Sequence, residues 1–204
     1  LSEKTSYGWD GGICLMGSFL KPKESIGFSR RLEAGESYVF FGGGDDDVKD
    51  LDLFVLDSEG NRVARDSKVD ATPMVEFTPE NSGVYTIRIR IFDAGQASFC
   101  ALGIFRKGGF NVPMDNLSTA AAKLIGACGK IAEKASGARF HQEANQWALF
   151  GAVMKEGESQ TITGLAPEEA NHAFVAMGDD NAKNLDLFLM TRGGDTLKED
   201  TDAD

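Results

Sequence analysis

The sequence contains few of the residues on which most enzymes and metalloproteins depend: two His, two Trp and three Cys among 204 residues. Three scattered cysteines are too few for a disulfide framework, and they lack the close Cys and His pairs that a zinc site needs. Basic residues are also in deficit, with 21 Lys and Arg against 32 Asp and Glu and a formal net charge of −11. Because nucleic acids and anionic membranes are bound through Lys and Arg, this charge argues against both partners. No apolar run reaches the ~18 residues of a membrane-spanning helix, so membrane insertion is not expected.

The motifs of the common catalytic machineries are missing as well. There is no G-x-S-x-G nucleophile elbow, no H-E-x-x-H helix and no Cys–His signature. The two histidines, His141 and His172, are far apart in the sequence and have unrelated surroundings. The glycines at 42–44 are followed by three Asp rather than by Gly-Lys-Ser, and these carboxylates would repel a phosphate. We therefore predict that the protein is not an enzyme.

What the sequence does contain is an internal repeat. Residues 44–54 (GDDDVKDLDLF) reappear as residues 178–188 (GDDNAKNLDLF), an offset of 134. Over residues 40–70 and their counterparts, 12 of 31 positions are identical. Upstream the match is weaker and pairs Leu15, Gly17, Lys21, Glu24 and Ser25 with Leu149, Gly151, Lys155, Glu158 and Ser159. We interpret the two stretches as copies of one module.

The first copy alternates short apolar stretches with turn residues. Residues 85–91 (YTIRIRI) show the clearest period of two, which indicates a strand with one buried face. Several strands with turns every 8–12 residues are typical of an antiparallel β-sandwich. The predicted strands are residues 13–20, 25–32, 37–42, 50–57, 62–66, 74–78, 84–92 and 98–105. We predict a mainly β fold of tandem antiparallel β-sandwich modules, jelly-roll or immunoglobulin-like, joined by one α-helix.

The helix is predicted between the copies, where the apolar period changes from two to 3.6. Apolar residues recur there every three or four positions, which places them on one face of a helix. These positions are Leu117, Ala121, Leu124, Ile125, Cys128, Ile131 and Ala132. We predict a first module at residues 1–106, a loop and connector helix at 107–146 with the helix at about 116–136, and a second module at 147–204.

The second module is incomplete at its C-terminal end in this sequence. Residue 204 is the counterpart of residue 70, so the part that matches residues 71–105, three strands of the first module, is missing. A half sandwich exposes an unpaired strand edge, and such edges invite association. Two interpretations stay open: the sequence is a fragment of a longer protein, or another chain supplies the missing strands by swapping or strand donation.

Acidic clusters occur in both copies and form the candidate metal site. Ca²⁺ takes six to eight oxygen ligands, which carboxylates can supply. The spacing does not match an EF-hand loop, because Lys49 and Lys183 interrupt the runs. The alternative is a solvated loop whose Asp side chains cap turns. The candidate calcium ligands are Asp45, Asp46, Asp47, Asp50, Asp179 and Asp180.

Two cysteines lie on predicted strands of the first module. Cys14 is on the first strand and Cys100 on the last, and these strands could be neighbours in a sandwich. Neighbouring strands would allow a disulfide between Cys14 and Cys100, and the alternative is two small buried thiols. Cys128 lies on the apolar face of the predicted helix, where we expect it to pack.

Two stretches of the first copy resemble the bacterial pre-peptidase C-terminal domain. Residues 50–61 (DLDLFVLDSEGN) have its Asp-rich strand followed by a D-x-x-G-N turn, and residues 77–89 (FTPENSGVYTIRI) have its P-x-x-S-G-x-Y strand. The resemblance covers about residues 18–106 and again 151–204. It implies a β-sandwich that serves as a non-catalytic accessory domain of exported bacterial hydrolases. Matrix-binding and calcium-stabilised modules are among the relatives that it implies.

These observations predict a non-catalytic bacterial protein that acts in binding or structural assembly and is secreted, periplasmic or located at the cell surface. One alternative is a calcium-stabilised adhesive module that binds polysaccharide or protein, and a third is an enzyme of unknown chemistry. The expected partner is a protein or a polysaccharide, or another copy of the chain.

Overall fold

The computed structural model describes residues 6–135, 137–141, 146–167 and 169–202. The chain forms two compact units. The first contains the residues up to 111 together with residues 140–165, and the second contains residues 112–139 and those from 166 onward. Residues 147–165, which the repeat assigns to the second module, therefore fold with the first unit.

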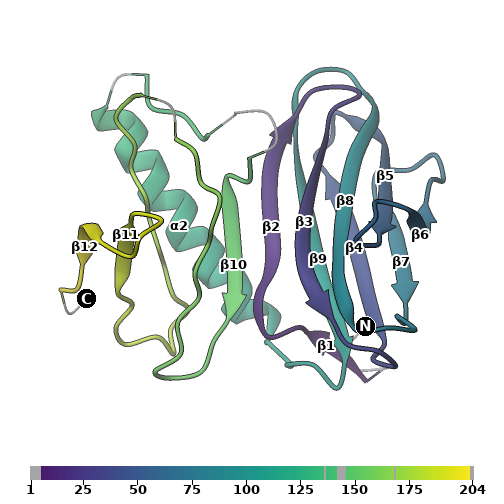
Figure 1. Ribbon diagram of the computed structural model, residues 1–204. Helices are drawn as coiled ribbons and strands as arrows, with labels where there is room; N and C mark the ends of the chain where they lie inside the picture. The colour runs from purple at the N-terminus through teal and green to yellow at the C-terminus, as the bar shows by residue number, and fades with distance from the viewer. Residues whose placement is uncertain (1–5, 136, 142–145, 168, 203–204) are drawn as a thin grey trace. The chain divides into compact units, whose positions relative to one another are not determined.

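The first unit is an antiparallel β-sandwich, which confirms the predicted mainly β, sandwich-type fold (Figure 1). The second of the two predicted sandwich modules is not formed by the described residues, whose β11 and β12 make only a two-stranded sheet. One sheet has the strand order β10-β2-β9-β4-β7 with β1 also paired to β9, and the other has the order β3-β8-β5-β6. All eight predicted strands are present, and their ends agree within two residues. They are β2 (Gly12–Leu20), β3 (Ser25–Leu32), β4 (Tyr38–Gly44), β5 (Val48–Leu56), β6 (Arg62–Asp66), β7 (Met74–Phe77), β8 (Gly83–Ala94) and β9 (Ser98–Lys107). The first unit also contains β1 (Tyr7–Trp9) and β10 (Leu149–Val153), which are not among the predicted strands.

The core lies between the two sheets and follows the period of two along each strand. On β8, the side chains of Ile87, Ile89 and Ile91 are fully buried, whereas that of Arg88 is exposed. Each such buried aliphatic side chain stabilises the fold by roughly 1.5–3 kcal/mol. The other fully buried large side chains are Met16, Leu20, Leu32, Phe40, Leu51, Leu53, Val55, Leu102 and Ile104.

Strand β10 is the counterpart of residues 15–19 of β2, and it pairs with β2 itself. The register is reciprocal in the repeat numbering, because Leu149 lies opposite Gly17 and Gly151 lies opposite Leu15. After subtraction of the offset of 134, Leu149 is position 15 and Gly151 is position 17 of the second copy. Position 15 of each copy therefore lies opposite position 17 of the other, as in an antiparallel interface with a two-fold axis. The sheet of the first unit therefore continues into the first strand of the second repeat.

In its described residues, the second unit contains the helix α2 (Met114–Lys134) and the hairpin of β11 (Leu187–Met190) and β12 (Thr196–Asp200). The helix agrees with the prediction for residues 116–136 to within two residues, and residue 136 itself lies outside the described residues. No side chain of α2 is buried. Within the part of the chain that the structure describes, no helix has both the length and the apolar character needed to cross a membrane.

The β11–β12 hairpin has the same register as β5–β6. Leu53 lies opposite Asp66, and Leu187 lies opposite Asp200 at the same offset of 134. Both ladders shift register before their last pair, between Val55 and Leu56 in one and between Leu189 and Met190 in the other. Both turns contain a glycine with positive φ, Gly60 at 85° and Gly194 at 94°, which glycine adopts without steric cost. The two hairpins therefore share their local structure.

Candidate functional site

A buried carboxylate, Asp10, fixes the chain just before β2. Its Oδ2 lies 3.0 Å from Nη1 of Arg30, and its Oδ1 lies 3.1 Å from Nε of Arg106. The backbone N–H of Gly11 donates a 2.9 Å hydrogen bond to the same Oδ1. The Arg106 contact is an ion pair without an aligned hydrogen bond at Nε. Because an isolated buried carboxylate is very costly, these partners hold Asp10 and the start of β2 in one position.

Two glycines let a second segment approach this region closely. Trp9 and Phe110 exchange two 2.8 Å backbone hydrogen bonds. A Cβ on Gly8 would lie 2.5 Å from the carbonyl oxygen of Gly109, so a side chain there would push the two backbones apart. The close approach places Phe110, which follows β9, next to the start of β2.

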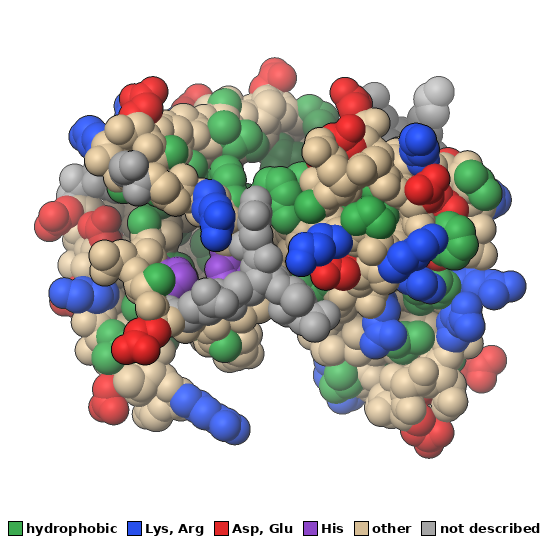
Figure 2. Space-filling model, turned by 90° about the horizontal axis from the view of Figure 1, so that it is seen from above, with side chains coloured by type: hydrophobic (Ala, Val, Ile, Leu, Met, Phe, Trp, Pro, Cys, Tyr) green, Lys and Arg blue, Asp and Glu red, His purple; other side chains and the backbone are tan. Residues whose placement is uncertain are grey.

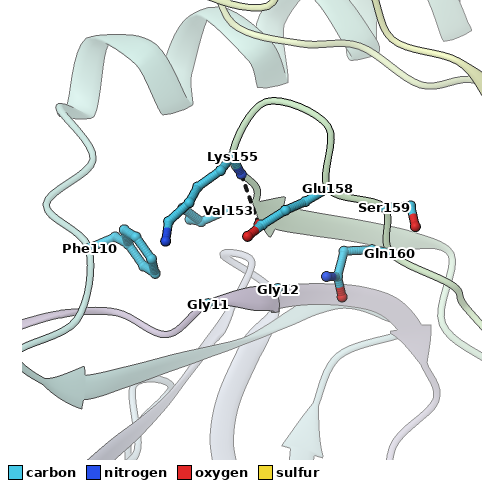
Figure 3. A pocket seen from close by; sticks show the side chains of 8 residues that line it. All are labelled: Gly11, Gly12, Phe110, Val153, Lys155, Glu158, Ser159 and Gln160. Atoms are coloured by element: carbon cyan, nitrogen blue, oxygen red, sulfur yellow. Dashed lines mark hydrogen bonds between the residues drawn. The ribbon is translucent and has the colours of Figure 1, made fainter.

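Gly11 and Gly12 form the floor of a shallow pocket of about 390 Å³ (Figure 3). Phe110 lies at one end of the pocket, and Gln160 lies at the other end. Gly12 has a φ of 73°, and a Cβ there would lie only 2.8 Å from Oε1 of Gln160, so glycine keeps the floor open. The remaining lining residues are Val153, Lys155, Glu158 and Ser159.

One wall of the pocket is a tight turn that occurs in both repeats. The backbone N–H of Lys155 donates to Oε2 of Glu158 at 3.0 Å, and that of Lys21 donates to Oε2 of Glu24 at 2.9 Å. In the pocket copy, the ammonium of Lys155 lies 5.8 Å from the centre of the Phe110 ring. The turn thus places a positive group beside the aromatic ring and a carboxylate on the same wall.

The lining offers binding groups and few reactive ones. It contains one carboxylate, one ammonium, one amide, one hydroxyl and one aromatic ring. It contains no His, no Cys and no second carboxylate, which nucleophilic or paired-carboxylate catalysis would need. Placed polar groups beside an aromatic ring can orient a small ligand. The lining thus offers hydrogen-bonding groups and one aromatic ring side by side.

Charge is mixed over the face of the molecule drawn in Figure 2. Red Asp and Glu side chains alternate there with blue Lys and Arg side chains. Several of the blue side chains lie close together in the right half of this view.

The acidic residues predicted as calcium ligands in the first copy have other partners. Asp45 Oδ2 accepts a 2.8 Å hydrogen bond from the backbone N–H of Phe99 on β9, and Oδ1 accepts one of 3.2 Å from that of Asp47. Asp47 in turn accepts a 2.6 Å hydrogen bond from Gln96. Asp46 is exposed. Asp45 and Asp47 therefore order turns, as in the alternative interpretation of this loop.

In the second copy, the corresponding residues contact helix α2. Asn116 donates a 2.6 Å hydrogen bond to Asp179, and Nζ of Lys123 lies 2.8 Å from Oδ1 of Asp180. The Asn116 hydrogen bond is the largest of several that lower the pKa of Asp179. In the described ranges, no three His, Cys, Asp or Glu side chains are close enough to hold a metal ion. The structure thus assembles no ligand set from the predicted residues, and calcium binding stays a prediction.

Asp50 is the predicted ligand with an unusual environment. Its side chain is buried, and its Oδ1 has no hydrogen-bond partner among the described residues. Asp52, also buried, lies two residues further along β5 on the same side of the strand. Burial, followed by the charge of Asp50, raises the pKa of Asp52, although Arg90 and Arg62 oppose this shift. A buried carboxylate oxygen without a partner is costly, so Asp50 is the acidic residue with most to gain from a ligand.

The suggested disulfide between Cys14 and Cys100 is wrong, because both thiols are free. Their strands, β2 and β9, are neighbours as expected, but Cys100 lies opposite Ser18 rather than Cys14. Four residues along a strand separate the two positions by about 13 Å, far beyond the ~6 Å between Cα atoms of a disulfide. Burial raises the pKa of Cys14 to about 11 and that of Cys100 to about 12. Both therefore behave as packed, unreactive thiols.

No protein-family model and no curated protein matches the sequence. Among solved structures, the chain is similar to the pre-peptidase C-terminal domain of a collagenase from Bacillus anthracis. The identity is 10% and the TM-score 0.39, over 46% of this chain and 90% of that one. This chain resembles a pre-peptidase C-terminal domain.

Two other solved structures are similar to this chain. One is PliG of Aeromonas hydrophila, a periplasmic inhibitor of g-type lysozyme, at 12% identity and a TM-score of 0.35, over 51% of this chain and 90% of that one. The other is the CBM36-1 domain of a multidomain xylanase from the hindgut metagenome of Trinervitermes trinervoides. It is 15% identical with a TM-score of 0.27, over 54% of this chain and 94% of that one.

The pocket was not among the sites predicted from the sequence. Its residues come from three separate segments, around residues 11–12, at 110 and at 153–160, which only the fold brings together. One signal was present: the pairing of Lys21 and Glu24 with Lys155 and Glu158 in the repeat marks the turn that forms the wall. Nothing in that pairing indicates a pocket, because the turn supplies only one wall and the other lining residues come from distant segments.

Proposed function

We propose that this protein is a non-catalytic binding protein that takes a saccharide in the pocket above Gly11 and Gly12. The observation that carries the proposal is the lining, in which the Phe110 ring lies across the glycine floor from the amide of Gln160. Sugars have apolar C–H faces that lie on aromatic rings and hydroxyls that pair with amide, hydroxyl and carboxylate groups. A volume of about 390 Å³ is at the small end of ligand pockets, which suits one or two sugar units.

The shape of this pocket is set before any ligand arrives. Its floor is fixed by the contacts of Asp10, and its wall by the turn that joins Lys155 to Glu158. A preorganised site loses little conformational entropy on binding, which favours affinity for a small ligand.

We also propose that the protein is exported and works in the periplasm, outside the cell or on its surface. The pre-peptidase-like motifs support this location, since they imply an accessory domain of exported bacterial proteins. The free thiols Cys14 and Cys100 are compatible with it, because burial keeps them protonated and out of reach of oxidants.

Replacing Phe110 by Ala is expected to weaken saccharide binding at least tenfold, because the variant removes the only aromatic surface of the lining. The measurement is a screen of immobilised glycans with the purified protein, followed by calorimetric titration of the sugar that binds. Gln160→Ala should also weaken binding, since it removes the amide at the far end of the pocket.

The matched control is Phe92→Ala. Phe92 is another partly exposed Phe with a Lys above its ring, Lys23 at 3.7 Å, but it lies outside the pocket. It should leave affinity unchanged. Equal affinity of the wild type and the Phe110 variant would contradict the proposed site. If the protein instead bound a protein ligand, and the Phe110 variant bound that ligand more weakly, the pocket would remain the binding site but its ligand would not be a saccharide.

A calcium-stabilised adhesive module is the second candidate, favoured by the unpaired buried oxygen of Asp50. If Ca²⁺ binds there, the melting temperature in millimolar Ca²⁺ will be several degrees higher than in a buffer with chelator, and Asp50→Asn will abolish this difference. Asp46→Asn, which changes an exposed member of the same acidic run, is the control and should keep the rise. An equal melting temperature of the wild type in both buffers would remove this candidate.

A further inference from the structure

The outer face of the β3-β8-β5-β6 sheet is rich in arginine, although the chain as a whole is acidic. On β8 the outward residues alternate with the buried isoleucines, so Arg88 and Arg90 lie on this face. Phe54 lies on it as well, because it is directly opposite Arg88 on the neighbouring strand β5. The remaining arginines of the face are Arg31 on β3 and Arg62 and Arg65 on β6. These arginines therefore share one side of a single sheet.

Phe54 lies at the centre of this face, between two arginines. The strand register places it directly opposite Arg88 on one side and Arg65 on the other. Side chains that are directly opposite on one face have Cβ atoms about 4.5–5.5 Å apart. The guanidinium carbon of Arg62 lies 5.1 Å from the centre of the Phe54 ring. We refer to Phe54, Arg62, Arg65 and Arg88 as the arginine cluster.

The charge of the cluster is not neutralised by acidic side chains. The guanidinium groups of Arg65 and Arg88 make no hydrogen bond or ion pair with any described residue. Arg31, on the same face, differs from them because its Nε lies 2.9 Å from Oε1 of Glu33. The uncompensated positive charge of the face is therefore concentrated around the Phe54 ring.

The surface is hollowed next to the cluster. A shallow hollow of about 360 Å³ extends along β6, and its lining residues are Arg62, Val63, Ala64 and Arg65. Strand β6 lies at the edge of its sheet, but its ladder with β5 shifts register between Val55 and Leu56. Such an irregularity hinders the addition of a further strand to the edge. An occupant of this surface therefore contacts its side chains rather than extending the sheet.

The cluster combines groups that recognise two different parts of one ligand. A guanidinium group pairs with a carboxylate through two parallel hydrogen bonds, and an aromatic ring packs against apolar C–H surface. Arg65 and Arg88 lie two strand spacings apart, about 10 Å, with Phe54 between them. A ligand that meets all three groups has carboxylates separated by apolar surface. A chain of uronic acids has this pattern, because each sugar carries one carboxylate and an apolar ring face.

A dense polyanion such as a nucleic acid fits the same surface less well. Acidic residues flank the cluster along β5: Asp52 lies two residues before Phe54 on the same face, and Asp57 and Glu59 lie in the turn to β6. In a nucleic acid strand, a charge recurs about every 3.4 Å. Phosphates next to those on the cluster would therefore meet these carboxylates.

We propose that the arginine cluster binds an acidic polysaccharide. Carboxylates of its uronic acid residues pair with Arg65 and Arg88, and the face of a sugar ring lies on Phe54. The site is separate from the pocket of the proposed function, because no residue of β3, β5, β6 or β8 lines that pocket. The two sites can therefore be tested independently.

The test titrates the purified protein, at low ionic strength, with an oligomer of galacturonic acid and with its methyl ester, which has the same rings without the charges. We expect the acid to bind about tenfold more tightly than the ester, and Arg65→Gln or Arg88→Gln to weaken binding of the acid about tenfold. Arg31→Gln is the matched control, because this exposed arginine is already paired, and it should change the affinity by less than about twofold.

Several results would overturn the proposal. They are no binding of the acid, equal binding of acid and ester, and equal affinity of the wild type and the Arg88 variant. Equally tight binding of single-stranded DNA or of polyglutamate would also overturn it, because charge alone would then explain the affinity. A loss of affinity with Phe110→Ala but not with Arg88→Gln would place the oligomer in the pocket, which contradicts the cluster and leaves the proposed function intact.

Discussion

Leu53→Ala will destabilise the first unit by about 2–5 kcal/mol, whereas Leu187→Ala will cost less than about 1 kcal/mol. The two residues occupy the same position of the two repeats, but Leu53 is fully buried and Leu187 is only half-buried. Truncating a buried Leu loses its transfer free energy and leaves a cavity, whereas a half-exposed side chain has less to lose. The measurement is urea unfolding of each variant and of the wild type, monitored by circular dichroism.

The comparison is informative because the two substitutions remove the same atoms from the same kind of hairpin. Differences in strand propensity therefore cancel, and burial alone separates the variants. Equal losses for the two would contradict the assignment of a complete core to the first unit alone.

Asp10→Ala will destabilise the first unit by about 2–4 kcal/mol, because it leaves Arg30 and Arg106 without their shared carboxylate. Breaking a buried ion pair costs about 3–5 kcal/mol, and the partial exposure of the two Arg side chains reduces that figure. The variant also loses the hydrogen bond from Gly11, so the pocket floor should loosen and saccharide affinity should fall. Thermal unfolding and the titration described for Phe110 measure the two effects.

Asp10→Asn and Arg31→Ala complete this experiment. The first keeps the size of the side chain and removes its charge, so it should lose most of the stability that Asp10→Ala loses. The second breaks the Arg31–Glu33 pair, which is of similar length at 2.9 Å but exposed, and should change little. If the exposed pair proved as important as the buried one, desolvation would not explain the role of Asp10.

The strands of the first unit could be predicted because their signal is local. The alternation of residues 85–91 and the turn at residues 57–61 are properties of neighbouring residues, and the structure has β8 and the β5–β6 turn there. The helix was predicted for the same reason, from the spacing of Leu117, Leu124 and Ile131.

The features that were missed depend on residues distant in the sequence. The repeat implies that residues 149–153 are a strand, but not that they pair with β2 of the other copy. The disulfide prediction identified neighbouring strands and failed on register, because a strand pattern does not reveal which residues lie opposite each other. The acidic runs carried the same ambiguity: composition does not distinguish turn-capping carboxylates from metal ligands, and Asp45 is held by an N–H of β9.

Native-state hydrogen exchange of the unaltered chain tests the central claim most directly. The claim is that the first repeat forms a complete sandwich, whereas residues 172–200 of the second repeat keep the local turns and hairpin of the first repeat without its two sheets. We predict that amides of β8 and β9 exchange only through global unfolding, and that those of residues 172–186 exchange at least 100-fold faster. Similar protection of the two repeats would contradict the account.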